Sequence, residues 1–232
     1  MTSRTSSMDV PVITVDGPGG SGKGTIALRL ASRLGWNFLD SGALYRLVAV
    51  AARTRGIELE HGAAVAAVAR DLDVEFRRWD EEVRPYLDGH DVGDEIRRDD
   101  VSRAASIVAA VPAVRAALVN RQRAFRRAPG LVADGRDMGT VIFPDAALKI
   151  YLTASAEERA KRRYKQLKEK GESVNLSRLF REIEARDARD ASREVAPLRP
   201  ADDAVIIDST DLGINEVLKQ VYKLVEERHI IT

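Results

Sequence analysis

A glycine-rich segment between an apolar run and a helical pattern constrains this chain more than any other feature. Val12–Val15 predicts a buried strand, and Thr25–Leu34 has the apolar spacing of a helix. The glycines between them allow a sharp turn whose backbone N–H groups point inward and can hold phosphate oxygens. The helix adds the positive end of its dipole, and Lys23 can reach the β- and γ-phosphates. The segment therefore predicts a phosphate-binding loop (P-loop) for a nucleoside triphosphate.

One position departs from the usual pattern of such loops, in which Ser or Thr follows the lysine directly. Here Gly24 follows Lys23 and Thr25 comes next. Thr25 is the candidate ligand for the Mg²⁺ ion that accompanies a triphosphate. The loop residues predicted to bind the nucleotide are Gly17, Pro18, Gly19, Gly20, Ser21, Gly22, Lys23, Gly24 and Thr25.

Short apolar runs alternate with helical patterns along the rest of the chain. Strands are predicted at Val12–Val15, Trp36–Leu39, Leu131–Ala133, Ala147–Leu152 and Ala204–Ile207. Continuous apolar strands separated by helices favour a parallel sheet that helices cover on both faces. The predicted fold class is therefore α/β, with a five-stranded parallel sheet of the P-loop type flanked by helices.

Two segments interrupt this alternation. Asp71–Val92 has apolar residues among charges and a turn at Asp88-Gly89, which predicts a small antiparallel insert. Ser155–Arg193 is helical and contains 12 basic and 8 acidic residues, with Gly171 between two helical arms. The second segment concentrates positive charge in a chain that is otherwise balanced.

Three arginines in that segment, Arg186, Arg189 and Arg193, have the spacing of one helix face. One interpretation is a solvated face of salt bridges, and the other is a cationic lid that closes over phosphates. The basic residues nearer the start of the segment are interpreted as solvated or as packing within the lid; they are Arg159, Arg162, Arg163 and Lys165.

The composition argues against several classes of protein. Among 232 residues, 37 basic and 36 acidic side chains give a net charge of +1, so no nucleic-acid or anionic-membrane partner is expected. The chain has no Cys, which excludes a disulfide scaffold and fits a cytoplasmic location. No apolar stretch approaches the length of about 18 residues that a membrane span needs. Met1–Asp9 is expected to be a disordered polar tail.

A phosphate-binding loop occurs in GTPase switches, in ATP-driven motors and in small-molecule kinases, so further features must choose among them. The chain has no Asn-Lys-x-Asp segment to read guanine, and it is short for the machinery of a motor. The cationic segment follows the fourth predicted strand, where a lid would cover a transferred phosphoryl group. These features favour a kinase.

Four motifs give this chain a specific resemblance. The loop Gly17–Thr25 resembles that of the nucleoside monophosphate kinases, and Leu39–Arg46, Ala133–Thr140 and Arg186–Asp190 narrow the likeness to the bacterial cytidylate kinases. The resemblance implies Mg²⁺-assisted phosphoryl transfer from ATP to CMP or dCMP, in pyrimidine nucleotide metabolism, by a monomer. It further implies one kinase domain over 10–232, with a core at 10–42, 129–154 and 195–232, a nucleoside monophosphate-binding region with its insert at 43–128, and a lid at 155–194.

The resemblance also assigns residues to the acceptor. Arg46 and Arg136 would hold its phosphate, because a guanidinium fork suits a phosphate dianion. Ser106, Arg115 and Asp137 would read cytosine, whose N4 donates to a carboxylate and whose N3 and O2 accept from an arginine. The predicted CMP-binding residues are Ser41, Arg46, Ser106, Arg115, Asp134, Arg136, Asp137, Asp190 and Arg193, and the predicted catalytic residues are Lys23, Arg136, Arg186 and Arg193.

Some alternatives stay open at this point. The acceptor could be another small molecule such as AMP or UMP, or the protein could be a nucleotide-gated regulator without turnover. Ser106 lies in an Ala-rich helical pattern and could simply be a small packing residue. Asp134, at the end of an apolar strand, could orient a Mg²⁺-bound water or the acceptor, or it could cap the next turn.

Overall fold

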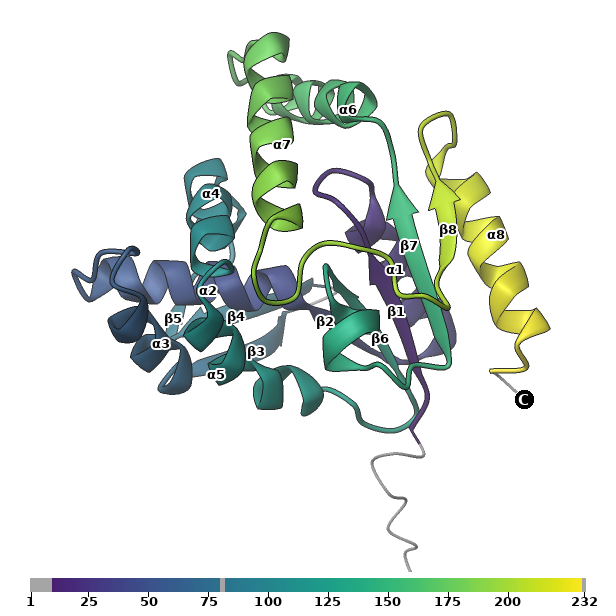
Figure 1. The fold of residues 1–232 in the computed structure, drawn as a ribbon, viewed down its shortest axis with the longest axis horizontal. Helices are drawn as coiled ribbons and strands as arrows, with labels where there is room; N and C mark the ends of the chain where they lie inside the picture. The colour runs from purple at the N-terminus through teal and green to yellow at the C-terminus, as the bar shows by residue number, and fades with distance from the viewer. Residues whose placement is uncertain (1–9, 80–81, 231–232) are drawn as a thin grey trace, which may run out of the picture. The chain divides into compact units, whose positions relative to one another are not determined.

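The computed structural model describes residues 10–79 and 82–230 (Figure 1). The predicted disordered tail at Met1–Asp9 lies outside the described residues. The chain divides into two compact units, one formed by Met1–Asp40 with Arg123–Thr232 and the other by Ser41–Gln122. Each unit is described by itself below.

The first unit is built on a five-stranded parallel sheet in the order β2-β6-β1-β7-β8. Its strands are β1 (Val12–Asp16), β2 (Asn37–Asp40), β6 (Leu131–Gly135), β7 (Leu148–Thr153) and β8 (Val205–Asp208). All five residues of the central strand β1 are buried. The α/β class and the five parallel strands predicted from the apolar runs are confirmed.

All five strands of this sheet extend one or two residues further toward their carboxyl ends than the apolar pattern predicts. The reason is that backbone pairing continues through polar residues, as in the pairs Asp16–Gly135 and Asp40–Asp134. These polar ends gather at one edge of the sheet, because all strands run in the same direction. The apolar pattern therefore misses the ends of the strands at the edge where the polar side chains lie.

Helices α1 (Lys23–Leu34) and α8 (Ile214–Glu227) pack on the sheet in the first unit (Figure 1). Ile26 and Leu30 of α1 join Val217 and Val221 of α8 in one apolar core with the central strands. Gly35 ends α1 in the left-handed conformation, as the glycine at this position predicts. Burial of this helix face anchors the residue at the start of α1, which is Lys23.

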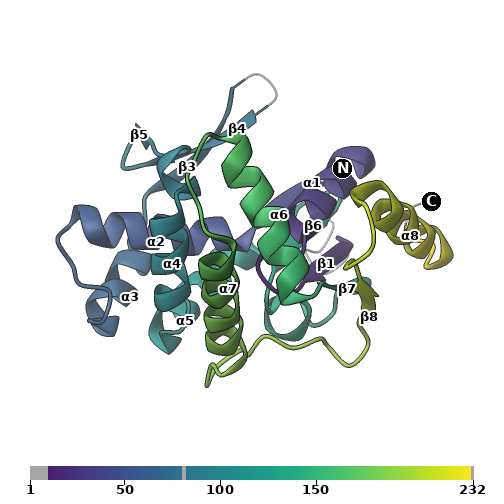
Figure 2. The same ribbon diagram turned by 90° about the horizontal axis from the view of Figure 1, so that it is seen from above.

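The cationic segment forms two helices that pack against each other, α6 (Ala156–Glu169) and α7 (Leu176–Ala191) (Figure 2). The Ser155 hydroxyl accepts a hydrogen bond from the backbone N–H of Glu158 at 3.2 Å, and Gly171 takes a positive φ between the helices. One prediction is wrong: Arg193 does not lie on the helix face of Arg186, because α7 ends at Ala191. Ser192 caps the helix through its backbone N–H, which donates to the Ala188 carbonyl at 3.0 Å.

The second unit combines helices with a small antiparallel sheet. Its helices are α2 (Ser41–Thr54), α3 (Gly62–Arg70), η2 (Glu95–Arg97), α4 (Asp99–Val108) and α5 (Pro112–Arg123), and its strands are β3 (Val74–Trp79), β4 (Glu82–Leu87) and β5 (His90–Asp91). The strands pair in the order β3-β4-β5, with positive φ at Asp88 and Gly89, which confirms the predicted antiparallel insert.

Over residues 10–79 and 82–230, each helix by itself is too short or too polar for a membrane span. Asp99–Val108 and Pro112–Arg123 meet the length and composition criteria only when counted together, across a bend of 102°.

Candidate phosphate-binding site

The P-loop connects the central strand β1 to helix α1, and its backbone requires glycine. Gly17 has a φ of 149°, and a Cβ atom there would lie 2.0 Å from the carbonyl oxygen of Leu152 in β7. Gly20 and Gly22 also have positive φ values, which glycine adopts without steric strain. The Ser21 hydroxyl donates to the Pro18 carbonyl at 3.1 Å and closes the loop on itself. The glycine backbone and the Ser21 hydrogen bond therefore fix the conformation of the loop, as a phosphate-binding loop requires.

Lys23, the first residue of α1, lies folded over this loop. Its Nζ donates to the Pro18 carbonyl at 3.4 Å and lies 3.8 Å from Asp134 Oδ1, at the end of β6. Burial and the positive charges of Arg136 and Arg186 lower the pKa of Lys23 to about 8, although the Asp134 carboxylate opposes the shift. The ammonium is thus poorly solvated and lies near two other cations, and the negative charge of a bound polyphosphate would offset both effects.

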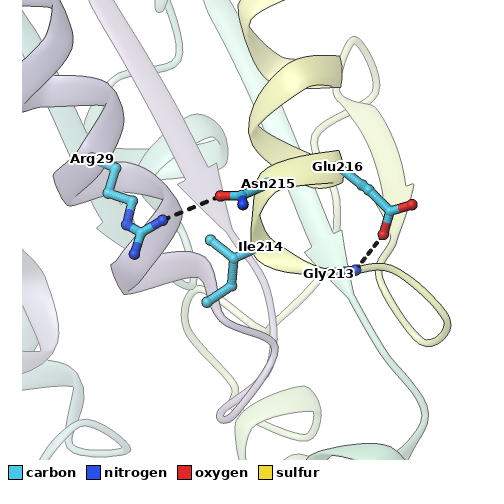
Figure 3. Close-up of a pocket in the computed structure, with 5 residues that line it drawn as sticks. All are labelled: Arg29, Gly213, Ile214, Asn215 and Glu216. Atoms are coloured by element: carbon cyan, nitrogen blue, oxygen red, sulfur yellow. Dashed lines mark hydrogen bonds between the residues drawn. The ribbon is translucent and has the colours of Figure 1, made fainter.

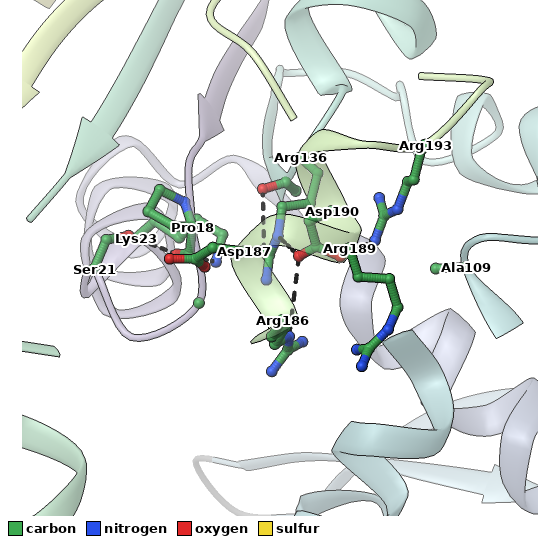
Figure 4. Close-up of polar contacts among 12 residues, drawn as sticks. Pro18, Ser21, Lys23, Ala109, Arg136, Arg186, Asp187, Arg189, Asp190 and Arg193 are labelled. Carbon is green, nitrogen blue, oxygen red and sulfur yellow. Dashed lines mark hydrogen bonds and ion pairs between the residues drawn. The ribbon is translucent and has the colours of Figure 1, made fainter. Parts of the chain in front are cut away.

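Three arginines converge on one buried carboxylate, that of Asp190 in α7 (Figure 4). Arg136 Nε donates to Asp190 Oδ2 at 2.9 Å, and Arg186 Nε lies 4.0 Å from the same oxygen. Arg193 donates to Asp190 Oδ1. Burial alone would raise the pKa of Asp190, but these three guanidinium groups outweigh burial and hold it below its ordinary value. We call Arg136, Arg186, Asp190 and Arg193 the arginine cluster.

The P-loop and the arginine cluster belong to one site within the first unit. A Cβ atom on Gly19 would lie 3.4 Å from Arg136 Nη2 and 3.5 Å from Arg186 Nη1. Two of the cluster's guanidinium groups therefore reach the loop that would hold a triphosphate. The cluster holds three positive charges around one negative charge, so it attracts anions beyond those that the loop itself binds.

Two basic residues that the sequence assigns to solvent or lid packing also contact the P-loop and the end of the sheet, and the ion pair of Arg159 with Asp187 of α7 agrees with packing within the lid. Arg159 is buried, with Nη1 on the Gly19 carbonyl at 3.1 Å and Nη2 on Asp187 Oδ2 at 2.5 Å. Arg162 donates to the Ser209 carbonyl at 2.5 Å, and the Ser209 hydroxyl contacts the Ser21 carbonyl at 3.3 Å. Both residues link α6 to the loop. In the sequence, Arg159 and Arg162 have the same charged helical surroundings as basic residues that face solvent. The pattern alone therefore could not predict their contacts.

The candidates in the second unit are described within that unit. Ser41 begins α2 and is buried, and Arg46 lies half-buried one turn further on. Ser106 is buried in α4. Arg115 in α5 is buried as well; its Nη1 donates to the Ala109 carbonyl at 3.1 Å, and its guanidinium carbon lies 5.5 Å from the centre of the Tyr45 ring.

A pocket lies between α1 and the start of α8, with a volume of about 490 Å³ (Figure 3). It is lined by Arg29, Gly213, Ile214, Asn215 and Glu216. The Glu216 carboxylate already accepts a hydrogen bond from the backbone N–H of Gly213 at 2.7 Å. The residues predicted to bind nucleotide do not line this pocket.

Comparison with known proteins identifies the family. A family model described as cytidylate kinase matches residues 13–227. A cytidylate kinase from Stutzerimonas stutzeri is 59% identical over 95% of this chain and 97% of its own length, and one from Aeromonas hydrophila is 56% identical over 94% and 95%. The chain belongs to the cytidylate kinase family. A shikimate kinase from Acinetobacter baumannii in complex with shikimate is a distant likeness, 19% identical over 97% of each chain with a TM-score of 0.42.

The family name implies nucleotide-dependent phosphoryl transfer, and the residues around the P-loop fit a Mg²⁺ ion that phosphate oxygens would mainly hold. Among residues 10–79 and 82–230, no group of three or more His, Asp or Glu side chains could hold a metal ion alone. Mg²⁺ usually keeps several waters and takes one or two protein oxygens plus substrate phosphates. Thr25 is exposed in α1, and the Asp134 carboxylate lies beside Lys23. The hydroxyl of Thr25 and the carboxylate of Asp134 are oxygen ligands of the kind that Mg²⁺ binds.

Proposed function

We propose that this protein transfers the γ-phosphoryl group of ATP to CMP or dCMP, giving ADP and CDP or dCDP. Membership of the cytidylate kinase family supports the acceptor. The observation that carries the proposal is the arginine cluster beside the P-loop, because a second set of cationic groups is what a second phosphate-bearing substrate requires. A cytoplasmic, monomeric enzyme is part of the same proposal, as the family likeness implies.

The proposed reaction needs no general base. A phosphate oxygen of CMP is already anionic when it forms a bond to the γ-phosphorus, and the bond from that phosphorus to the β-phosphate oxygen breaks with its electron pair on ADP. Lys23 would neutralise the β- and γ-phosphates. Arg136, Arg186 and Arg193 would bind the acceptor phosphate and the group in transfer, and Asp190 would hold their guanidinium groups in place beforehand.

Mg²⁺, when bound with ATP, would neutralise charge on the β- and γ-phosphate oxygens. We propose that Thr25 and Asp134 hold it, directly or through water. The P-loop residues Gly17–Thr25 would bind the triphosphate through backbone N–H groups, and residues 208–210, at the end of β8 and just beyond it, would lie near the donor base.

The remaining candidates would bind the acceptor nucleoside. Arg46 would join Arg136 on its phosphate, and Ser41 and Asp190 would lie near the sugar. Ser106, Arg115 and Asp137 would read the base. UMP would leave two buried polar groups of this set unpaired, at about 1–3 kcal/mol each. The preference for CMP over UMP should therefore be roughly 30-fold or more.

Steady-state kinetics with CMP, dCMP, UMP and AMP at saturating Mg-ATP tests this proposal, with phosphorus NMR to identify the products. We expect the highest kcat/KM for CMP or dCMP. Arg115→Met should remove the preference for CMP over UMP and leave KM for ATP nearly unchanged, because it deletes the donor to cytosine.

Arg121→Met is the matched control, since Arg121 lies on the same helix and also donates to a backbone carbonyl, that of Leu72 at 2.6 Å. It should leave the CMP preference intact. Faster turnover of AMP or UMP by the unmodified protein would overturn the cytosine assignment, and formation of no ADP with any acceptor would favour the nucleotide-gated regulator.

A further inference from the structure

Asp16, the last residue of β1, is a buried carboxylate that the proposed mechanism does not use. It pairs in register with Gly135 of β6 on one side and with Tyr151 of β7 on the other. Gly135 is the residue directly before Arg136. Asp16 therefore lies at the central strand end, beside the turn that leaves β6 with two of the candidate acceptor residues.

The Asp16 carboxylate holds that turn through two backbone hydrogen bonds. Its Oδ1 accepts from the N–H of Met138 at 2.9 Å, and its Oδ2 accepts from the N–H of Gly139 at 2.8 Å. Met138 and Gly139 begin the π-helical turn η3 (Met138–Ile142), and the first N–H groups of a helix have no partner within it. Asp16 thus caps the start of η3 from the neighbouring strand β1, and each of its carboxylate oxygens accepts one hydrogen bond.

The turn between β6 and η3 is consequently fixed at both ends. The sheet register holds Gly135, and Asp16 holds Met138 and Gly139. A Cβ atom on Gly139 would lie 2.8 Å from Thr14 Oγ1, so this end of the turn fits closely against β1. The two residues in between are Arg136, which reaches the arginine cluster, and Asp137, which is buried.

We propose that Asp16 is a positioning residue for the acceptor nucleotide, because it fixes the turn that presents Arg136 and Asp137. This inference rests on the proposed function. A carboxylate is the suitable group, since it offers two acceptor oxygens to two N–H donors, whereas a carboxamide offers one acceptor and one competing donor.

The surroundings of Asp16 disfavour the ionised form of its carboxyl group. Burial raises its pKa to about 7, Asp137 and Asp134 add to the rise, and the two backbone hydrogen bonds oppose it. Tyr151 faces it from β7. The unfolded chain ionises Asp16 near 3.8, so the folded state binds the extra proton between 3.8 and about 7. Stability contributed by this group falls as pH rises through that range. A destabilising charge at this place is consistent with a role in the site.

Asp16→Asn tests the proposal, with kinetics at pH 8. Misplacement of Arg136 and Asp137 should raise KM for CMP roughly 10- to 100-fold and reduce the CMP-to-UMP preference, with KM for ATP within about twofold. Asn37→Ala is the control: Asn37 Nδ2 donates to the Gly130 carbonyl at 3.0 Å and ties the chain before β6 instead of after it. It should lower stability without changing KM for CMP.

A second measurement uses the unmodified protein and applies whether or not Asp16→Asn folds. The amide protons of Met138 and Gly139, followed by NMR, should move together to lower field as pH rises through about 7. Unchanged kinetic constants in Asp16→Asn would overturn the inference. So would amide shifts of Met138 and Gly139 that stay constant from pH 3 to 9, because the carboxylate that accepts from both amides must titrate within that range. A failure of the proposed function is distinct, because the unmodified protein would then lack CMP kinase activity.

Discussion

Replacing Lys23 with Met should lower kcat roughly 10²- to 10³-fold, the range seen when one preorganised electrostatic contact to a developing charge is removed. Lys23 Nζ lies over the P-loop, 3.4 Å from the Pro18 carbonyl, where the triphosphate is proposed to bind. Methionine retains much of the length of the side chain and removes its charge. Rapid-quench or coupled assays of CDP formation measure the effect.

Lys223→Met is a suitable control for this variant. Lys223 is an exposed lysine on α8 whose Nζ lies 3.5 Å from Glu227, and its charge faces solvent. We expect wild-type kcat for Lys223→Met. Equal activity in the Lys23 and Lys223 variants would show that Lys23 takes no part in phosphoryl transfer.

The lowered pKa of Lys23 predicts that kcat/KM for ATP depends on pH. A lysine is charged below its pKa, and burial with Arg136 and Arg186 nearby lowers the pKa of Lys23 to about 8 in the free enzyme. The profile of kcat/KM for ATP should therefore fall as pH rises above about 8, because this parameter reports the free enzyme. Lys23→Arg should have lower activity without that alkaline decline, since arginine stays charged throughout the range.

Replacing Asp190 with Ala should destabilise the protein by about 3–5 kcal/mol, the usual effect of leaving a buried charge without its partner. Asp190 is 1% exposed and balances Arg136 and Arg193, whose side chains are 14% and 4% exposed. In the wild type, the low pKa of Asp190 makes its stabilisation complete above about pH 4 and progressively lost at lower pH. Chemical denaturation of both proteins at pH 7 measures the first effect, and denaturation of the wild type at pH values from 4 down to 2 measures the second.

Anions should partly rescue the Asp190 variant, because phosphate or CMP can replace the lost carboxylate as counter-charge for the arginines. The rise in melting temperature on adding CMP should be larger for Asp190→Ala than for the wild type. Glu182→Ala is the matched control, since Glu182 also pairs with an arginine on α7, Arg178, but the pair is exposed to solvent. Its effect should stay below about 1 kcal/mol. Equal losses for the two variants would contradict a structured arginine cluster.

The sequence predicts the sheet and the P-loop because both depend on local signals. The apolar runs identify five strands, and the glycines before Lys23 identify the loop, since each signal lies within about ten residues. The family resemblance also assigns Arg136, Arg186, Asp190 and Arg193 to the binding of phosphate and acceptor, and these residues lie together in the structure. The helix that the spacing predicts for Arg193 ends two residues earlier.

Other parts of the site depend on contacts that no local pattern encodes. Arg159 reaches the Gly19 carbonyl across 140 positions of sequence, and Asp16 reaches the N–H of Met138 across 122. In the sequence, Arg159 is one of several basic residues on a charged helix, and Asp16 is a polar residue that ends an apolar run. Their burial follows only from the arrangement of α6, β1 and β6 around the loop, which the periodicity of each segment does not determine.

The central claim is that two nucleotides bind with their phosphates facing each other between the P-loop and the arginine cluster. A crystal structure with an analogue that joins adenosine to cytidine through a chain of phosphates tests it most directly. We expect the phosphates to contact Lys23, Arg136 and Arg193, and the cytosine to contact Arg115 and Asp137. A phosphate chain outside the P-loop, or a cytosine bound away from Arg115 and Asp137, would contradict the claim.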